Sequence, residues 1–352
     1  MSVRRAALLA ATSVLALSVA ACGSATGSSG SEVSAGVSGS PAATSAAAAF
    51  PVTIEHAYGT TTIETKPERV ATVAWANHEV PIALGVVPVG MAKATWGDDD
   101  NDGVLPWVED ALTELGAPTP TLFDETDGID FEAVAAAQPD VILASYSGLT
   151  KEDYTTLSKI APVVAFPEVA WGTSWQDMVR LNSKALGLSA QGDALIAELE
   201  SDVDEALAAY PQLQDAKVLF SYIDPKDFSQ VGFYTSHDTR PGFLEELGLP
   251  VPAVVEEASA GTQEFYTTVS AEQADAFADV DLFVTYGDAG TDVVGQLQDD
   301  ALLSKIPAIS KGSVAVLENS TPLAASANPS PLSIRWGIDE YFALLAAGLP
   351  SQ

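Results

Sequence analysis

Short apolar runs alternate with amphipathic segments along most of the chain from residue 51 onward. Alternating polar and apolar residues around Gly59 predict a β-hairpin. After it, strand-like and helix-like segments follow one another in the order RVATVAW, NHEVPIALG, VVPVGMA, FEAVAAAQ, VILAS, KEDYTTLSK and APVVAF. Because this alternation is typical of an α/β layer, residues 51–188 are predicted to form one α/β lobe.

The longest amphipathic segment covers residues 189–210 and contains no proline. Apolar residues recur in it every four positions, at Leu195, Leu199, Val203 and Leu207. The spacing predicts a helix that ends before Pro211, and twenty helical residues span about 30 Å. We expect this helix to be a rigid strut that leads to a second α/β lobe over residues 211–352. The predicted fold class is therefore α/β, with two Rossmann-like lobes joined by a single long helix.

Two segments of the chain resemble each other. DFEAVAAAQPDVILASY covers residues 130–146 and SAEQADAFADVDLFVTY covers residues 270–286, and Glu132 and Glu272 each precede a tyrosine by fourteen positions. Both segments predict a short helix followed by an apolar strand, which suggests that the two lobes share a plan. Ligands of open parallel sheets bind beyond the carboxyl ends of the strands, so Tyr146 and Tyr286 are expected to line a cleft between the lobes. Chance similarity in an alanine- and aspartate-rich chain is the alternative.

Aromatic residues follow six of the predicted strands. They are Trp75, Trp96, Tyr146, Trp171, Tyr222 and Tyr286. One such residue alone would be typical of a core, but six at the same topological position favour a broad and partly apolar binding pocket.

The first residues predict a lipoprotein signal. MSVRR is followed by an apolar run that ends at VAAC, with small residues before Cys22. We expect residues 1–21 to be the signal peptide and Cys22, the only cysteine, to carry the lipid. Residues 22–50 have the composition of a disordered tether. A lipid anchor would then hold the folded part at the extracytoplasmic face of the cell membrane.

The charge of the chain excludes some partners. The signal peptide removes Arg4 and Arg5, which leaves 13 basic residues against 48 acidic ones, a net charge of −35. Nucleic acids and anionic lipids would be repelled. No nucleophile elbow, phosphate loop, dinucleotide fingerprint or HExxH motif occurs, so we predict no catalytic residues and no enzyme activity.

Metal binding by side chains is not predicted either. His56, His78 and His237 lack the spacing of a metal cluster. The acidic run at residues 98–102 offers oxygen ligands that could suit calcium. We interpret the run as lacking the register of an EF-hand and expect a solvated acidic loop.

Several motifs together resemble the substrate-binding lipoproteins of ABC importers for ferric siderophores, a group that includes the ferric-citrate, ferrichrome and cobalamin binders. They are PERVATVAW with ALGVVPVGMA, DFEAVAAAQPDVILAS, LSKIAPVV and PLSIRWGID, within a similarity that runs from Pro67 to Leu349. The resemblance implies a monomer of the class III periplasmic binding protein type, with one rigid bridging helix. It also implies that Glu132 and Glu272 dock onto arginines of the permease. An alternative is that both glutamates only favour the positive ends of their helices.

The resemblance further implies a ligand that carries its own iron, so no cofactor is expected. A siderophore needs aromatic walls and a few donors, and the expected contacts are Trp75, Trp96, Tyr146, Tyr222 and Tyr286, with the bases Lys93, Arg240 and Arg335. Anionic chelators usually require a cluster of bases. The acidic chain therefore favours a neutral or cationic hydroxamate complex. Arg335 could contact the ligand or form a salt bridge between the lobes.

Two other functions remain open at this point. Haem or cobalamin could be the ligand, with His78 or Tyr286 as the axial ligand of a haem iron. An extracytoplasmic enzyme on an α/β scaffold is the second, although no nucleophile is visibly paired with a base.

Overall fold

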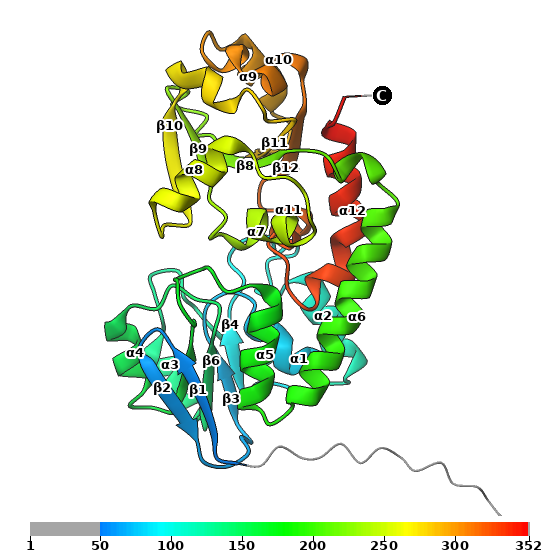
Figure 1. The fold of residues 1–352 in the computed structure, drawn as a ribbon. Helices are drawn as coiled ribbons and strands as arrows, with labels where there is room; N and C mark the ends of the chain where they lie inside the picture. The colour runs from blue at the N-terminus through cyan, green and yellow to red at the C-terminus, as the bar shows by residue number, and fades with distance from the viewer. Residues whose placement is uncertain (1–49, 351–352) are drawn as a thin grey trace, which may run out of the picture. The chain divides into compact units, whose positions relative to one another are not determined.

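The computed structural model describes residues 50–350 (Figure 1). Cys22, the predicted signal peptide and nearly all of the predicted tether lie outside the described residues. Within 50–350, no helix has both the length and the apolarity needed to cross a bilayer.

A hairpin opens the first lobe, as the alternation around Gly59 predicts. Strand β1 (Val52–His56) pairs antiparallel with β2 (Gly59–Ile63). Gly59 has a φ of +124°, which L side chains rarely adopt. Ile54 and Ile63 are buried and fasten the hairpin to the sheet of this lobe.

Five parallel strands form the sheet of the first lobe, in the order β5-β4-β3-β6-β7. Their bounds are Val70–Thr72 (β3), Gly90–Ala92 (β4), Thr121–Phe123 (β5), Val141–Ala144 (β6) and Val163–Ala165 (β7). Four apolar runs are thus confirmed as strands, whereas β5 was not predicted because only its last residue, Phe123, is buried and it lacks an apolar run. A Cβ at position 90 would lie 2.2 Å from the Phe123 ring, so glycine lets β4 and β5 pack closely.

Short helices surround this sheet. They are α1 (Glu79–Ala83), α2 (Pro106–Glu114), α3 (Phe131–Ala136), α4 (Lys151–Leu157) and α5 (Trp175–Ala185). The helices expected before Gly85, before Pro139 and after Thr150 are confirmed as α1, α3 and α4. Asp130 caps α3 by accepting from the Ala133 amide, and Thr150 forms a capping box with Asp153 on α4.

The sheet of the second lobe is mixed, in the order β10-β9-β8-β11-β12. Its strands are β8 (Val218–Tyr222), β9 (Gln230–Tyr234), β10 (Tyr266–Ser270), β11 (Leu282–Gly287) and β12 (Val314–Glu318). Strands β8, β11 and β12 are parallel as expected, but β9 is antiparallel to both β8 and β10. The two lobes therefore share only part of their plan. The partly exposed edge strand β10 lacks the apolar run by which buried strands are found.

The repeated segments also differ in conformation. α3 is an α-helix, whereas its counterpart η2 (Ala271–Phe277) is a 3₁₀-helix with non-helical angles at Gln273. The caps differ as well, because the Ser270 hydroxyl accepts from the second amide of η2, at Glu272, whereas Asp130 accepts from the third amide of α3. The similarity of sequence is thus wider than the similarity of backbone.

Other helical segments complete the second lobe. They are η1 (Pro211–Leu213), α7 (Thr239–Glu246), α8 (Ala253–Gly261), α9 (Val293–Asp299), η3 (Leu303–Lys305), α10 (Pro307–Lys311), α11 (Pro322–Ser326) and α12 (Ser333–Gly348).

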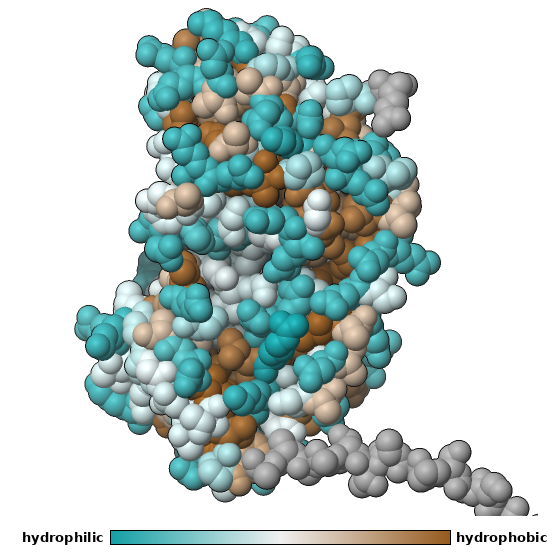
Figure 2. All heavy atoms as spheres, in the orientation of Figure 1, coloured by the Kyte–Doolittle hydropathy of each residue, from teal (hydrophilic) through white to brown (hydrophobic). Residues whose placement is uncertain are grey.

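The long helix α6 (Ser189–Ala208) covers nearly the whole segment predicted as the strut. It ends shortly before Pro211, and α12 packs along it (Figure 1). Hydrophobic side chains gather at this junction in Figure 2, and a single apolar core cluster joins α6 and α12 to the sheet of the second lobe and to helices α1 and α5 of the first.

A buried carboxyl fastens the start of α12 to the first lobe. Glu79, at the start of α1, accepts from the indole nitrogen of Trp107 at 2.8 Å and from the backbone amide of Leu332 at 2.9 Å. Burial raises the pKa of Glu79, although its hydrogen bonds lower it. The lobes are therefore linked by this contact as well as by α6.

Candidate functional site

The six aromatic residues lie at the carboxyl ends of their strands, and three of them form a chain between the lobes. The ring centroids of Trp75 and Trp96 are 6.4 Å apart, and those of Trp96 and Tyr286 are 5.7 Å apart. The Trp96 indole also donates to the side-chain oxygen of Asn319 at 3.3 Å. Trp96 belongs to the first lobe, whereas its partners Tyr286 and Asn319 belong to the second. This chain of rings therefore crosses from one lobe to the other.

Two cavities adjoin this chain of rings, one lined by Trp75 and the other by Tyr286. A cavity of about 230 Å³, which we call the first-lobe cavity, is lined by Trp75, Trp171, His78, Lys93 and Glu125, together with small neighbours. A second-lobe cavity of about 250 Å³ is lined by residues that include Tyr222, Asp224, Lys226, Tyr286, Asp288 and Asn319. Together they have the size of a small-molecule site.

Arg240, at the start of α7, is held rigidly beside Tyr286. Its guanidinium forms two hydrogen bonds of 2.8 Å with the Asp238 carboxylate and lies 3.7 Å from the ring centroid of Tyr234. A third nitrogen donates to the Tyr286 hydroxyl at 3.1 Å. Burial alone would lower the pKa of Arg240, but the Asp238 charge raises it above its usual value. The pair thus forms a fixed donor whose charge is already neutralised.

Tyr146 contacts the second lobe instead of lining either cavity. Its hydroxyl lies 3.2 Å from that of Thr239 and accepts from the Asn328 amide at 2.9 Å. Burial, followed by the Asp238 charge, raises the pKa of Tyr146 to about 12. Its ring meets Trp171 edge-on at 5.4 Å, so it supports a wall of the first-lobe cavity.

The two remaining predicted bases lie in different places. Lys93 is exposed and lines the first-lobe cavity. Arg335 binds Glu198 at 2.9 Å and Asp202 at 3.0 Å on α6, and it lines another cavity beside Trp336. These salt bridges tie α12 to the connecting helix α6 and do not join the two lobes directly, and contact of Arg335 with the ligand stays a prediction.

Asn77 was not identified from the sequence, yet it positions the walls of the site. This fully buried amide donates to the carbonyls of Val73 and Tyr146 at 2.9 and 2.8 Å and accepts from the Tyr146 amide at 3.2 Å. It thereby joins the ends of β3 and β6. Ala74 and Ala76 both have φ near +60°, a strained conformation that places Trp75 between them.

Glu125, which follows β5, was also missed. One carboxylate oxygen accepts from the Ala74 amide at 2.9 Å, and the other is buried without a hydrogen-bond partner. Burial raises the pKa of Glu125 to about 7. Nearby His78 has a buried Nδ1 without a partner, and burial lowers its pKa to about 4, so it is neutral at pH 7. An acidic residue two positions beyond an apolar run was the only local signal.

Residues 70–321 match the family model described as periplasmic binding protein. The chain belongs to the periplasmic binding protein family. Its fold is the class III type of this family, whose members are transport receptors and not enzymes.

Two curated members are similar over most of their length. The chain is 26% identical over 285 residues to the Fe(3+) dicitrate-binding periplasmic protein FecB of Escherichia coli, which covers 78% of this chain and 84% of that protein. It is 29% identical over 243 residues to the probable siderophore-binding lipoprotein YfiY of Bacillus subtilis, with coverage of 66% and 69%.

A solved structure shares more identity. Streptococcus pneumoniae PiaA in complex with ferrichrome is 47% identical and has a TM-score of 0.80, over 84% of this chain and 98% of that chain.

Both glutamates expected to dock onto a permease are exposed in this periplasmic binding protein. Glu132 lies in the first turn of α3 and Glu272 in the first turn of η2. Each belongs to a different lobe. Their pairing with a permease stays a prediction.

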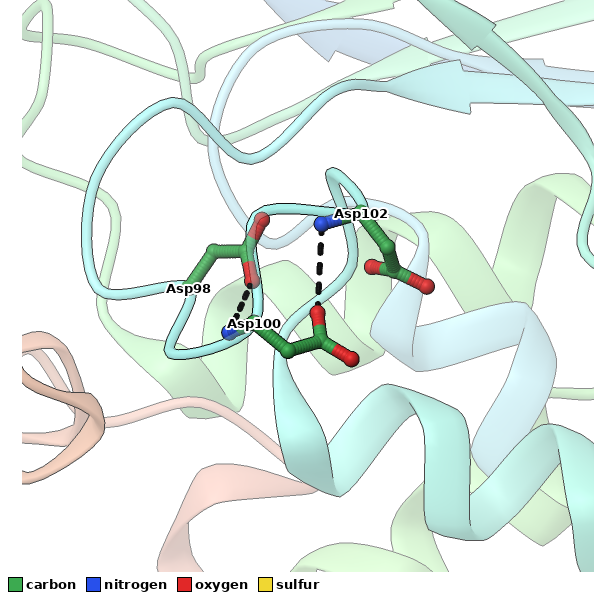
Figure 3. A group of neighbouring side chains, drawn as sticks. All are labelled: Asp98, Asp100 and Asp102. Carbon is green, nitrogen blue, oxygen red and sulfur yellow. Dashed lines mark hydrogen bonds between the residues drawn. The ribbon is translucent and has the colours of Figure 1, made fainter.

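The acidic loop of this periplasmic binding protein has a feature that the sequence interpretation overlooked. Asp98, Asp100 and Asp102 offer carboxylate oxygens within 4.8 Å of one another (Figure 3). The view that the run lacks an EF-hand register is wrong, because Gly103 and Glu109 occupy the sixth and twelfth positions counted from Asp98. Burial, and then the charge of Asp102, raises the pKa of Glu109. This set of oxygens is one that could hold a calcium ion.

Proposed function

We propose that this protein captures a ferric hydroxamate siderophore outside the cytoplasmic membrane and delivers it to an ABC importer. The observation that carries the proposal is its 47% identity to PiaA, whose solved structure contains ferrichrome, a ferric hydroxamate. Iron would travel inside the chelator, so aromatic walls and fixed donors meet the requirements of the site.

The charges around the site support an uncharged or cationic ligand. Arg240 is neutralised by Asp238, and the first-lobe cavity is lined by one base, Lys93, and one acid, Glu125, which form no salt bridge with each other. In the second-lobe cavity, Lys226 is outnumbered by Asp224 and Asp288. A ferric catecholate or citrate complex carries negative charge, which this lining would not compensate.

The expected contacts follow from the lining. Tyr222, Tyr286 and Trp75 would pack against the chelator. Arg240 does not line either cavity, but its guanidinium binds the Tyr286 hydroxyl, and it would donate to hydroxamate oxygens beside that ring. In this structure Trp96 contacts the Tyr286 ring and donates a hydrogen bond to Asn319. When a ligand binds, we expect the Trp96 side chain either to be displaced or to cover the ligand. Tyr146 would contribute indirectly, because its ring supports Trp171 in the wall of the first-lobe cavity.

Titration calorimetry with ferrichrome, ferric citrate and ferric enterobactin tests the proposal. We expect ferrichrome to bind most tightly, with an affinity that changes little with salt because screening removes little from a neutral ligand. Trp75→Ala should weaken ferrichrome binding by roughly thirtyfold, the usual loss for a buried aromatic contact of about 2 kcal/mol. Trp336→Ala removes an exposed indole outside both cavities and is the matched control. Preference for an anionic complex, with a steep loss in salt, would contradict the hydroxamate assignment.

A lipid on Cys22 and docking through Glu132 and Glu272 complete the proposed transport role. The signal sequence supports the lipid on Cys22, and the exposure of one glutamate on each lobe supports docking. The alternative of haem is less favoured, because the Tyr286 hydroxyl already accepts from Arg240. A Soret band on adding hemin would revive it.

A further inference from the structure

The first-lobe cavity contains an acceptor that the protein does not satisfy. The Glu125 carboxyl uses one oxygen to accept from the Ala74 amide, at 2.9 Å, while its other oxygen is buried and has no hydrogen-bond partner. Buried polar atoms are nearly always paired, so an unpaired one needs an explanation. A group supplied by the ligand would provide the missing donor.

No cation of the described residues is paired with this carboxylate. None of the five salt bridges within residues 50–350 includes Glu125. The other titratable residues that line the cavity are Lys93, whose side chain is exposed, and His78, which is neutral at pH 7. The negative charge of Glu125 is therefore available to a bound cation.

The remaining walls of this cavity suit a cation too. Trp75 and Trp171 both line it, and indole rings attract ammonium groups through their π-electrons. Trp171 is held in place with a φ of 61° by a hydrogen bond from its amide to the Ser147 carbonyl. A Cβ at position 148 would lie 2.2 Å from its indole nitrogen, so Gly148 makes room for this ring. The position of Trp171 in the cavity wall is therefore fixed by this hydrogen bond and by close packing against Gly148.

We propose that the first-lobe cavity binds an ammonium group on the chelator, with Glu125 accepting its hydrogen bond between Trp75 and Trp171. The inference rests on the proposed capture of a ferric hydroxamate and adds to it a preference for complexes that carry a free amine. The strongly negative chain would also attract such cationic complexes from solution.

Three chelators that differ at the amine test the inference. Ferrioxamine B is a ferric hydroxamate with a free primary ammonium, its N-acetyl derivative lacks that charge, and ferrichrome is neutral. We expect the wild-type protein to bind ferrioxamine B at least about tenfold more tightly than the N-acetyl derivative, as for other charge-assisted hydrogen bonds. Glu125→Gln should abolish this preference, so that the variant binds ferrioxamine B and its N-acetyl derivative with about equal affinity.

Asp124→Asn is the matched control, because it removes the same charge from the neighbouring, exposed residue. It should retain the preference for ferrioxamine B. The wild-type protein supplies a second measurement that needs no variant. Its preference should shrink as the pH falls from 8 to 5, because Glu125 takes up a proton while His78 stays neutral over nearly all of this range.

The outcomes separate the two proposals. Equal affinity of the wild-type protein for ferrioxamine B and its N-acetyl derivative would overturn the ammonium site while leaving hydroxamate capture intact. A preference that survives in Glu125→Gln would overturn the role of this carboxyl. Failure of all three hydroxamates to bind would overturn the proposed function and this inference with it.

Discussion

Replacing Glu125 with glutamine should stabilise the protein at alkaline pH much more than at acid pH. The carboxyl ordinarily titrates near 4.5, and burial raises its pKa to about 7 in the folded protein. A difference of one between the pKa values of the folded and unfolded chains corresponds to about 1.4 kcal/mol. The interval from 4.5 to about 7 therefore corresponds to roughly 3 kcal/mol, an upper limit because the side chain is not wholly enclosed.

The sign follows from which state holds the proton. Below pH 4.5 the carboxyl is protonated in both the folded and unfolded chains, so it does not change the free energy of unfolding. Between pH 4.5 and about 7 the unfolded chain has released the proton and the folded protein has kept it, so stability falls as the pH rises. Above that range the loss is complete. Because glutamine carries no charge at any pH, the Glu125→Gln variant should not show this fall in the free energy of unfolding.

Urea unfolding followed by tryptophan fluorescence at pH 5 and pH 8.5 measures the effect. The gain in unfolding free energy from Glu125→Gln should be about 2 kcal/mol larger at pH 8.5 than at pH 5. Taking the difference between two pH values cancels any constant cost of the amide. For Asp124→Asn we expect no such alkaline gain, because the Thr126 hydroxyl and amide lower the pKa of this exposed carboxyl. An equal effect of Glu125→Gln at both pH values would show that the carboxylate reaches water, contrary to the structure.

Three further predictions concern other parts of the chain. Cys22→Ser should release the protein from membranes without changing ligand affinity, and a variant that still sediments with membranes in high salt would contradict the lipid anchor. The double variant Glu132→Ala, Glu272→Ala should keep its ligand affinity within about twofold but abolish iron uptake in cells that lack the wild-type copy. The reason is that losing one partner of an interface ion pair costs about 2–5 kcal/mol of binding free energy. Normal iron uptake by the double variant would refute docking through these glutamates. Millimolar calcium should raise the melting temperature of the protein relative to EDTA, because the register of residues 98–109 matches a calcium loop. Asp100→Ala should remove that rise. Identical melting curves in calcium and in EDTA would show that residues 98–102 form only a solvated acidic loop.

The local pattern of the sequence was enough to predict most central elements. Apolar runs identified β3, β6, β8 and β11, because strands buried on both faces are apolar along their length. Four-residue spacing identified α6. The aromatic residues were correctly placed at or beyond the carboxyl ends of their strands, since the segment that leaves a buried strand starts at that edge of the sheet. The acidic loop's register was also legible in the sequence and was overlooked.

Tertiary structure alone decided how these elements and side chains are paired. Strand β9 runs antiparallel because of its neighbours β8 and β10, a choice that its own residues do not reveal. Glu125 meets the Ala74 amide across 51 positions of sequence, and Arg335 meets Glu198 across 137. Burial of a polar group, and with it the altered pKa and the missing hydrogen-bond partner, depends on every chain segment packed around that group. Nearby sequence therefore predicts where a strand ends, while only the folded chain determines which side chains meet there.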